Sequence, residues 1–355
     1  MAIDYNALFE DVSKEQLKTF RRQEKAVSSA NVAYIFLSVV AFVFLGYFTY
    51  VIVAAEISRE GRPERVALII AVALAIAVGG IFAARALSTV AARRRYRMTR
   101  FATRNGLFYS TTAIASPHPG SIFQTGSSRQ IYERLWRTDS PSLDIGNYRY
   151  TTGSGKHKQT HLWHYLALRL PRRLPHMVLD AKGNNSLFGS NLPVSFGKSQ
   201  RLSLEGNFDQ YFTLYCPREY ETDALYVFTP DLMALLIDEA ANLDVEIIDD
   251  WMLVYSKSKL DFTDPHALRR LFTIVDTVGA KTANRSSRYA DDRMTGESPD
   301  DLAHQGALGV ASRLSHNQIA PQGSRLKQQA PVLVIVITVA VVGVWFFARF
   351  MMGVG

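Results

Sequence analysis

Three long runs of uncharged, mostly apolar residues constrain this chain more than any other feature. The runs Asn31–Ala55, Val66–Ala84 and Val332–Ala348 contain no Asp, Glu, Lys or Arg. At a rise of about 1.5 Å per residue, a helix of each run crosses most or all of a hydrocarbon core of about 30 Å. Core helices of a soluble protein would carry a polar stripe over this length. The sequence therefore predicts three transmembrane helices, a hairpin within 30–88 and a single span at 331–352.

Basic residues beside the predicted spans set their orientation. Lys and Arg are concentrated in the N-terminal tail, after the second span and before the third, and three more arginines lie in the loop of the hairpin. Because basic flanks are retained in the cytoplasm, we expect the N-terminus and the main domain to be cytoplasmic and the C-terminus extracytoplasmic. The single cysteine, Cys216, agrees, since external domains more often contain paired cysteines.

Two polar segments flank the predicted hairpin. In 1–29, Ser13-Lys14-Glu15-Gln16 fits a capping box and predicts a short cytosolic helix. Segment 89–104 predicts a basic juxtamembrane helix that ends at Asn105-Gly106, a left-handed stop. Each basic residue near an anionic membrane surface contributes about 1 kcal/mol to binding, although such residues can also serve only as the topology signal. The candidates for contact with anionic lipids are Arg93, Arg94, Arg95, Arg97, Arg100 and Arg104.

Small residues recur every four positions along the second predicted span. Small side chains on one helix face let two backbones approach closely in lipid. We therefore predict a packing face for another span or for a partner protein; the alternative is that alanine is simply common in such spans. The face consists of Ala71, Ala75, Gly79 and Ala83.

The region 105–281 has the pattern of a separate domain. Thr229-Pro230-Asp231 predicts one helix start, and Asp264-Pro265 predicts a second helix that ends at Gly279. Asp249-Asp250-Trp251 is predicted to turn a hairpin. Strands with interspersed helices and no regular βαβ alternation predict an α+β domain with a mainly antiparallel sheet. The expected strands are 145–151, 160–170, 175–180, 201–204, 211–216, 224–228, 245–248 and 252–255.

The segment 282–330 loses this pattern. It is polar, rich in Gly and Ser, and has no sustained period. We expect a flexible linker that leads to the third span.

The stretch TTGSGKHKQTHLWH, residues 151–164, contains two apparent site motifs. Gly155-Lys156 resembles the end of a phosphate-binding loop, but Tyr150 stands where the first glycine belongs, and His157 stands where Ser or Thr belongs. The flanks are strands on both sides, so we expect a Gly-rich hairpin turn with Lys156 and Lys158 at its tip. No nucleotide cofactor is predicted.

Whether the histidines of this stretch can share one site depends on whether they lie on a helix or on a strand. On a helix, His157, His161 and His164 would share one face, whereas a strand directs His161 and His164 to opposite faces. Trp163 and Tyr165 in a hairpin context favour the strand, so we expect no metal site. Lys156, Lys158, His161 and Trp163 remain as a possible contact surface for a headgroup or a protein.

No other motif identifies chemistry. The chain lacks a G-x-S-x-G elbow and an H-E-x-x-H motif. The net charge of +8 lies largely at the membrane flanks, and no groove-binding motif indicates nucleic acid. One group of acidic residues is expected to form a solvated face, with a cation-binding or basic-partner surface as the alternative. Its members are Asp238, Glu239, Asp244, Glu246, Asp249 and Asp250.

The stretch Leu204–Asp250 resembles a bacterial integral membrane protein family that is catalogued only as a domain of unknown function. The likeness rests on EGNFDQYF at Glu205–Phe212, on ALYVFTPDLM at Ala224–Met233 and on IGNYRY at Ile145–Tyr150. The resemblance implies a pair of spans with a cytosolic α+β domain in a bacterial plasma membrane, and no catalytic residues. Some members are encoded near LemA-type membrane proteins, which implies a protein partner.

We therefore expect a non-enzymatic, membrane-anchored interaction or scaffold protein without a cofactor, whose partners are the bilayer and a membrane protein or further copies of itself. Confinement at the membrane raises the effective concentration of the domain for such partners. The alternative is an enzyme or ligand-binding module that acts on a lipid or cell-envelope precursor. Its pocket would be lined by Tyr148, Tyr150, His161, Trp163 and Arg169.

Overall fold

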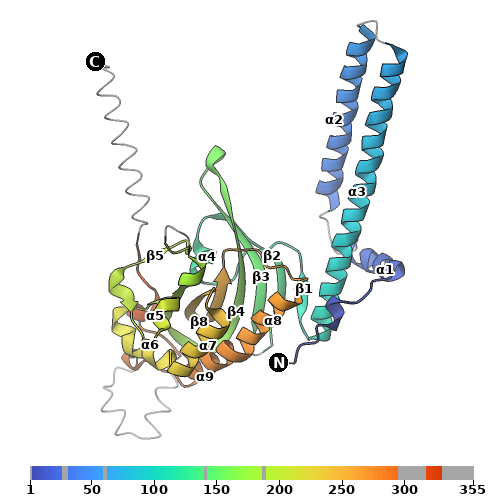
Figure 1. Cartoon of the computed structure of the whole chain (residues 1–355). Helices are drawn as coiled ribbons and strands as arrows, with labels where there is room; N and C mark the ends of the chain where they lie inside the picture. Colours follow the sequence, from blue (N-terminus) through green and yellow to red (C-terminus); the bar gives the residue numbers. More distant parts are fainter. Residues whose placement is uncertain are drawn as a thin grey trace, which may run out of the picture. The chain divides into compact units, whose positions relative to one another are not determined.

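The structure, a computed structural model, describes residues 2–25, 31–58, 62–139, 142–185, 189–294 and 317–329. The chain divides into two compact units (Figure 1). Asp4–Asn105 forms a helical unit, and a second, α+β unit follows from Gly106.

The helical unit contains three helices, α1 (Lys14–Lys25), α2 (Asn31–Ser58) and α3 (Pro63–Arg104), after a short 3-10 turn at Asn6–Leu8. The predicted capping box is confirmed at α1: Ser13 N donates to Gln16 Oε1 at 2.9 Å, and Gln16 N donates to Ser13 Oγ at 3.2 Å. Leu17 and Val12 pack on Ala92 and Tyr96 of α3. The capping box stabilises the start of α1, and this apolar contact holds α1 against α3.

One helix among the described residues is long and apolar enough to cross a membrane. It is α3, with 42 residues and a mean hydropathy of 2.8 over its most apolar window. The Val43–Ser58 part of α2 is apolar but shorter. The predicted C-terminal span at 331–352 lies outside the described residues. The structure thus supports one candidate span and leaves the three-span anchor as a proposal.

The second unit is an α+β domain with an antiparallel sheet, as predicted. Seven strands pair in the order β1-β2-β3-β4-β7-β6, with β8 also paired to β4, and every pairing between described strands is antiparallel. The strands are β1 (Phe108–Ser110), β2 (Ser127–Arg137), β3 (Leu143–Thr152), β4 (Gln159–Ala181), β6 (Arg201–Leu202), β7 (Phe212–Tyr215) and β8 (Asp244–Ser256). A separate pair joins β5 (Ser195–Phe196) to β9 (Gln328–Gln329).

The two longest strands differ from their predictions. The expected strands 160–170 and 175–180 are one strand, β4, whose pairing with β8 is irregular between Arg169 and Met177. Pro171 and Pro175 lie in this interval and cannot donate a ladder hydrogen bond. The expected hairpin at 249–251 is wrong: β8 continues through it, and Asp249 absorbs the irregularity with a φ of +55°. A single left-handed residue can bend a strand without reversing it.

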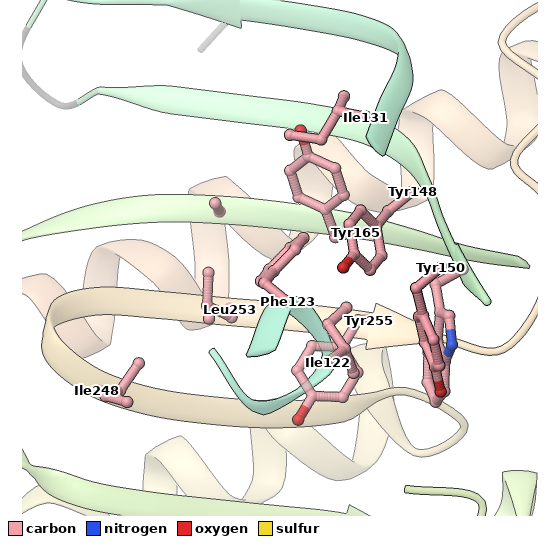
Figure 2. Close-up of a cluster of buried hydrophobic side chains, with 11 residues drawn as sticks. Ile122, Phe123, Ile131, Tyr148, Tyr150, Tyr165, Ile248, Leu253 and Tyr255 are labelled. Carbon is pink, nitrogen blue, oxygen red and sulfur yellow. The ribbon is translucent and has the colours of Figure 1, made fainter. Parts of the chain in front are cut away.

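An aromatic cluster fills the interior of this domain (Figure 2). Phe123 meets Tyr148 at a ring-centroid distance of 4.8 Å and Tyr165 at 5.2 Å, both edge to face. Trp163 meets Tyr255 at 5.8 Å in the same geometry. Such contacts add stability beyond burial of area, so these strands are fixed by their aromatic side chains. The cluster comprises Ile122, Phe123, Ile131, Tyr148, Tyr150, Trp163, Tyr165, Ala167, Ile248, Leu253 and Tyr255.

One predicted strand and one predicted helix end need correction. Residues 224–228 are predicted as a strand, but 224–227 belong to α6 (Glu221–Val227) and Phe228 is its C-cap. The helix buries Ala224 and Val227 at a spacing of three. The helix from Pro265 does not end at Gly279. It runs from α8 (Pro265–Ile274) through a π-helical turn (Val275–Gly279) into α9 (Ala280–Ser287), and a Cβ at Gly279 would lie 2.7 Å from Leu168 of β4. The glycine permits close packing here instead of stopping the helix.

The remaining helices of the domain are α4 (Ser121–Gln124), α5 (Phe208–Tyr211), α7 (Pro230–Ala240) and α12 (Pro321–Ser324). The predicted start of α7 is confirmed, with Pro230 at the first helical position after Thr229. The start of α8 is confirmed as well, where Asp264 Oδ1 accepts from His266 N at 2.9 Å.

The described parts of the expected linker are ordered. Residues up to Ser287 belong to α9, and Tyr289 and Asp291 are buried. Residues 317–329, called the C-terminal strap below, lie on the domain and end in β9. The linker prediction is therefore wrong at both described ends. These segments have no sequence periodicity, but buried hydrogen bonds with the rest of the domain order them. Residues 295–316 lie outside the described part.

Candidate functional site

The helical unit contains a basic pocket between α1 and α3. Its volume is about 510 Å³. Two apolar or neutral residues, Leu17 and Thr89, form part of its wall. The charged residues that line it are all basic: Lys14, Lys18, Arg21, Arg22 and Arg93. A pocket of this composition favours an anionic group such as a phosphate.

Local structure explains why these side chains converge. Lys14, Lys18, Arg21 and Arg22 recur at spacings of four, three and one along α1, which gathers them on one side of the helix. Arg21 Nη2 donates to Thr89 Oγ1 of α3 at 3.1 Å, and this bond joins α1 to α3 within the lining of the pocket. The sequence alone singled out Arg93 but not the residues of α1, because the approach of α1 to α3 is a tertiary contact.

The arginines predicted to contact lipids make different contacts in the structure. Only Arg93 lines the pocket. Arg95 forms a bidentate pair with Glu24, with Nε to Oε1 at 2.8 Å and Nη2 to Oε2 at 3.0 Å. The other pairs hold the N-terminal segment to α3: Arg97 Nε donates to Glu10 O at 2.9 Å, Arg100 pairs with Glu10 at 3.7 Å, and Arg104 pairs with Glu10 and with Asp4. Arg94 is partly buried.

The predicted small-residue face of α3 is exposed. Ala71, Ala75, Gly79 and Ala83 are all exposed, and nothing lies within 4 Å of a Cβ placed on Gly79. Within the uncharged run of the same helix, the partly buried positions are Val66, Ile69, Ala73 and Ala77. The small-residue face is therefore uncovered in the described part of the chain, and its role in packing stays a prediction.

The hairpin tip at 152–159 agrees with its prediction in part. Lys156 and Lys158 are exposed beside a short 3-10 turn, Gly155–His157. Trp163, however, is fully buried in the aromatic cluster, so its assignment to a contact surface is wrong. Its side chain follows the strand alternation that places Tyr165 in the same core.

His161 and His164 do not share a site. His161 stacks on Tyr150 at 4.8 Å and bonds Thr152 Oγ1 through Nε2 at 2.8 Å, whereas His164 bonds Ser258. Burial, helped by the charge of Lys257, lowers the pKa of His161. In the described part of the chain, no three His, Cys, Asp or Glu side chains come together as a metal site would require.

Of the five residues predicted to line a pocket in the alternative enzyme or ligand-binding function, two line a pocket in the structure. Tyr150 and His161 line a pocket of about 370 Å³. Tyr148 and Trp163 are core residues, and Arg169 pairs with Asp250 at 2.9 Å. The other lining residues are Asn184, Ser190, Asn191, Leu192, Pro193, Ser256 and Lys257.

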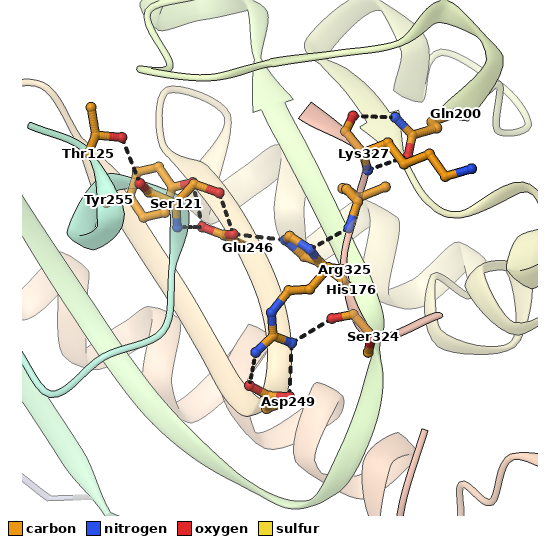
Figure 3. Close-up of polar contacts among 11 residues, drawn as sticks. Ser121, Thr125, His176, Gln200, Glu246, Asp249, Tyr255, Ser324, Arg325 and Lys327 are labelled. Atoms are coloured by element: carbon orange, nitrogen blue, oxygen red, sulfur yellow. Dashed lines mark hydrogen bonds and ion pairs between the residues drawn. The ribbon is translucent and has the colours of Figure 1, made fainter. Parts of the chain in front are cut away.

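A buried polar network, missed by the sequence, joins the domain to the C-terminal strap (Figure 3). Glu246 is fully buried and accepts from Ser121 N at 2.8 Å, Ser121 Oγ at 2.7 Å, Tyr255 OH at 3.0 Å and His176 Nε2 at 2.8 Å. Burial alone would raise the pKa of Glu246, but the hydrogen bonds from His176 and Ser121 hold it below its ordinary value. The network orders the strap and exposes no group to a substrate.

The strap has further contacts along its length. Arg325 pairs with Asp249 through two hydrogen bonds of 2.9 and 3.0 Å (Figure 3). Lys327 N donates to Gln200 Oε1 at 2.8 Å, and Gln200 Nε2 donates to Lys327 O at 2.8 Å. Leu326 and Ala320 are buried. The expectation of a solvated acidic face is wrong for Asp244 and Glu246, which are buried, and Asp249 and Asp250 are partly buried and paired.

A second buried histidine–carboxylate pair joins the segment before α4 to β3 of the sheet. His118 Nε2 is 2.8 Å from Asp144 Oδ2, and Asp144 also accepts from Arg134 Nε at 2.9 Å and from Tyr165 OH at 3.0 Å. The ring of His118 is packed against Phe123, Tyr165 and Trp251 and is 3% exposed. This enclosure makes the pair a structural element of the core.

Comparisons with known proteins assign no family. No family model matches the chain, and no curated protein matches it. Among solved structures, the chain is similar to the crystal structure of the mycobacterial trehalose monomycolate transport factor A, TtfA. The identity is 12%, the alignment covers 51% of this chain and 91% of that chain, and the TM-score is 0.33. A similarity at this level carries no argument about function.

Proposed function

We propose that this chain is a membrane-anchored, non-enzymatic interaction protein that binds the headgroup of an anionic lipid in the pocket between α1 and α3. The observation that carries the proposal is the charge of the pocket, whose ionisable lining residues are all Lys or Arg. Arginine forks match phosphate oxygens, and each basic residue at an anionic surface contributes about 1 kcal/mol.

The position of the pocket along α3 supports a headgroup as the ligand. The uncharged run Val66–Ala84 contains 19 residues and would span about 28 Å as a helix. Thr89 and Arg93 follow Ala84 by five and nine residues, which is about 7 and 13 Å along the helix axis. The headgroup layer occupies roughly the first 5–8 Å beyond the hydrocarbon core. With Val66–Ala84 across the bilayer, the pocket opens at and just below the lipid phosphates.

The anchoring part of the proposal extends the single candidate span to three. In this arrangement α2 and α3 cross a bacterial plasma membrane as a hairpin, the α+β domain is cytoplasmic, and 331–352 crosses to the outside. Ala330 alone separates β9 from Pro331, the first residue of that segment. A domain with an anchor at each end would remain beside the membrane, where its effective concentration for a membrane partner is high. An enzyme or ligand-binding module ranks second, because only Tyr150 and His161 of its predicted residues line a pocket.

Native mass spectrometry of the full chain in detergent, with added phosphatidylglycerol or phosphatidylcholine, tests the lipid site. We expect one retained phosphatidylglycerol and a loss of at least about tenfold in its affinity for Lys18→Glu/Arg22→Glu, since two of the pocket's cations are reversed. The matched control, Lys198→Glu/Lys259→Glu, reverses two exposed charges in the α+β domain and should retain the lipid. Equal retention of phosphatidylcholine, or equal loss in both variants, contradicts the proposal. Added inorganic phosphate should compete only if the phosphate group alone is recognised.

A further inference from the structure

Two carboxylates face each other where β4 ends and β8 begins. Leu179 pairs with Val245, and continuing this antiparallel register by one residue sets Asp180 opposite Asp244. Asp180 is 4% exposed and Asp244 is fully buried. Directly opposed residues have Cβ atoms about 4.5–5.5 Å apart, and like charges at such positions repel each other.

The neighbouring groups satisfy this pair only partly. Asp244 Oδ1 accepts from Ala181 N at 2.9 Å, and its Oδ2 accepts from Asn184 Nδ2 at 3.0 Å. The side chain of Asn191 also hydrogen-bonds Asp244, and all three of these donors are neutral. Burial raises the pKa of Asp244 to about 7, with a further contribution from the charge of Asp180. Burial also raises the pKa of Asp180, although hydrogen bonds from the side chains of Ser190 and Asn185 and the charge of Lys182 oppose this change.

Three buried oxygens in and around this pair accept no hydrogen bond within the part of the chain that the structure describes. They are Asp180 Oδ1, Asn184 Oδ1 and Asn191 Oδ1. The two asparagines are adjacent, since Asn191 Nδ2 donates to Asn184 O at 3.3 Å, and Asn184 Nδ2 also donates to Asn242 O. Buried acceptors are rarely left without a partner, so one carboxylate oxygen and two amide oxygens without donors call for a positive ligand.

We propose that Asp180, Asp244, Asn184 and Asn191 form a binding site for a hard divalent cation, with Ca²⁺ as the best fit. Ca²⁺ binds carboxylate, amide and water oxygens in flexible arrangements, whereas softer metals prefer sulfur or imidazole, which these four residues do not supply. Two carboxylates would neutralise the ion and remove their own repulsion.

The site has a route to solvent and a structural consequence. Asn184 and Asn191 line the pocket of about 370 Å³, which gives these two proposed ligands a route to solvent. A bound ion would tie the connection after β4 to the first residue of β8. This inference does not depend on the lipid site, which belongs to the other unit of the chain.

Thermal unfolding and calorimetry of the full chain in detergent, stripped with EDTA and titrated with CaCl₂ or MgCl₂, test the proposal. Wild type should gain melting temperature with Ca²⁺ and bind one ion, since a ligand that binds only the folded state stabilises it. Asp244→Asn should lower the affinity at least about tenfold. Asn191→Ala keeps both carboxylates and provides a second, milder variant should Asp244→Asn fold poorly; it too should bind more weakly.

The control for these variants is Asp238→Asn, which neutralises an exposed carboxylate on α7 and should bind Ca²⁺ as wild type does. A melting temperature and a calorimetric trace that do not respond to millimolar Ca²⁺ or Mg²⁺ overturn the proposal, and leave a carboxyl pair that shares a proton. Binding that persists at wild-type strength in both Asp244→Asn and Asn191→Ala also overturns it, because the ion would then bind elsewhere.

Discussion

His176 Nδ1 accepts a hydrogen bond of 2.9 Å from the backbone N–H of Leu326, 150 residues further along the chain. Because Nδ1 is the acceptor, the neutral ring carries its proton on Nε2 and donates it to Glu246 Oε1 at 2.8 Å. A single imidazole thus links a fully buried carboxylate in β8 to the C-terminal strap (Figure 3). This relationship makes the strap part of the domain's polar interior.

Replacing His176 by Ala should destabilise the domain by about 3 kcal/mol, because Glu246 would lose a charge-assisted hydrogen bond while remaining buried. Urea unfolding of the full chain in detergent, followed by tryptophan fluorescence, measures this change. His266→Ala is the matched control, since His266 is exposed at the start of α8. Equal loss of stability in the two variants would contradict the role given to His176.

Gly323→Ala should release the strap while the sheet stays folded. A Cβ at Gly323 would collide with the ring of Tyr220, which is itself fully buried. Overpacking of this kind costs about 1–3 kcal/mol, enough to open a segment of a dozen residues. Limited trypsin digestion at Arg325 and Lys327 should accelerate at least about fivefold, in line with that cost. Gly80→Ala, which meets nothing within 4 Å, should be cleaved at the wild-type rate.

Asp244 gives the stability of the domain a distinct pH dependence in EDTA. Its pKa is raised from 3.8 to about 7 in the folded state, so the folded state binds a proton that the unfolded chain has already released. The resulting loss of stability is absent below pH 4, grows as the pH rises, and is complete above pH 7. At about 1.4 kcal/mol per pKa unit its upper limit is about 4 kcal/mol.

Asp244→Asn removes this titration. The variant should therefore gain stability relative to wild type when both are moved from pH 5 to pH 8 in EDTA, as measured by urea unfolding at the two pH values. Glu246 acts in the opposite direction in both proteins, because its lowered pKa adds stability above the unfolded pKa that is lost on acidification. A difference between the two proteins that does not change with pH would show that Asp244 does not titrate in this range.

Trp163 and the hairpin tip should respond to mutation in contrasting ways. Trp163→Ala removes a fully buried side chain from the aromatic cluster (Figure 2) and should cost about 3–5 kcal/mol of unfolding free energy. Lys156→Ala and Lys158→Ala alter exposed side chains and should change it by less than about 0.5 kcal/mol. Chemical denaturation of the three variants separates a core residue from a surface residue. A mild effect at Trp163 would mean that its site is open to solvent.

The sequence by itself determined the features that depend on neighbouring residues. The uncharged run in α3, the capping box at Ser13, and the starts of α7 and α8 at Pro230 and Pro265 are local, because a helix is started and stopped by groups within one turn. Strand alternation separated His161 from His164 for the same reason. The α+β class with an antiparallel sheet followed from the order of these elements.

Only the tertiary structure decided which polar residues are buried together. In the sequence, Asp244 and Glu246 look like the acidic residues of a solvated face. They differ from exposed acidic residues only in the folded domain, where β4 and the strap cover β8. Lys18 and Arg22 became a pocket only because α1 packs on α3. Residues 317–329 have no period of their own, and their order comes from contacts such as that of Leu326 with His176. A contact between residues many tens of positions apart leaves no periodic pattern in a single sequence, because it does not constrain the types of the residues next to either partner.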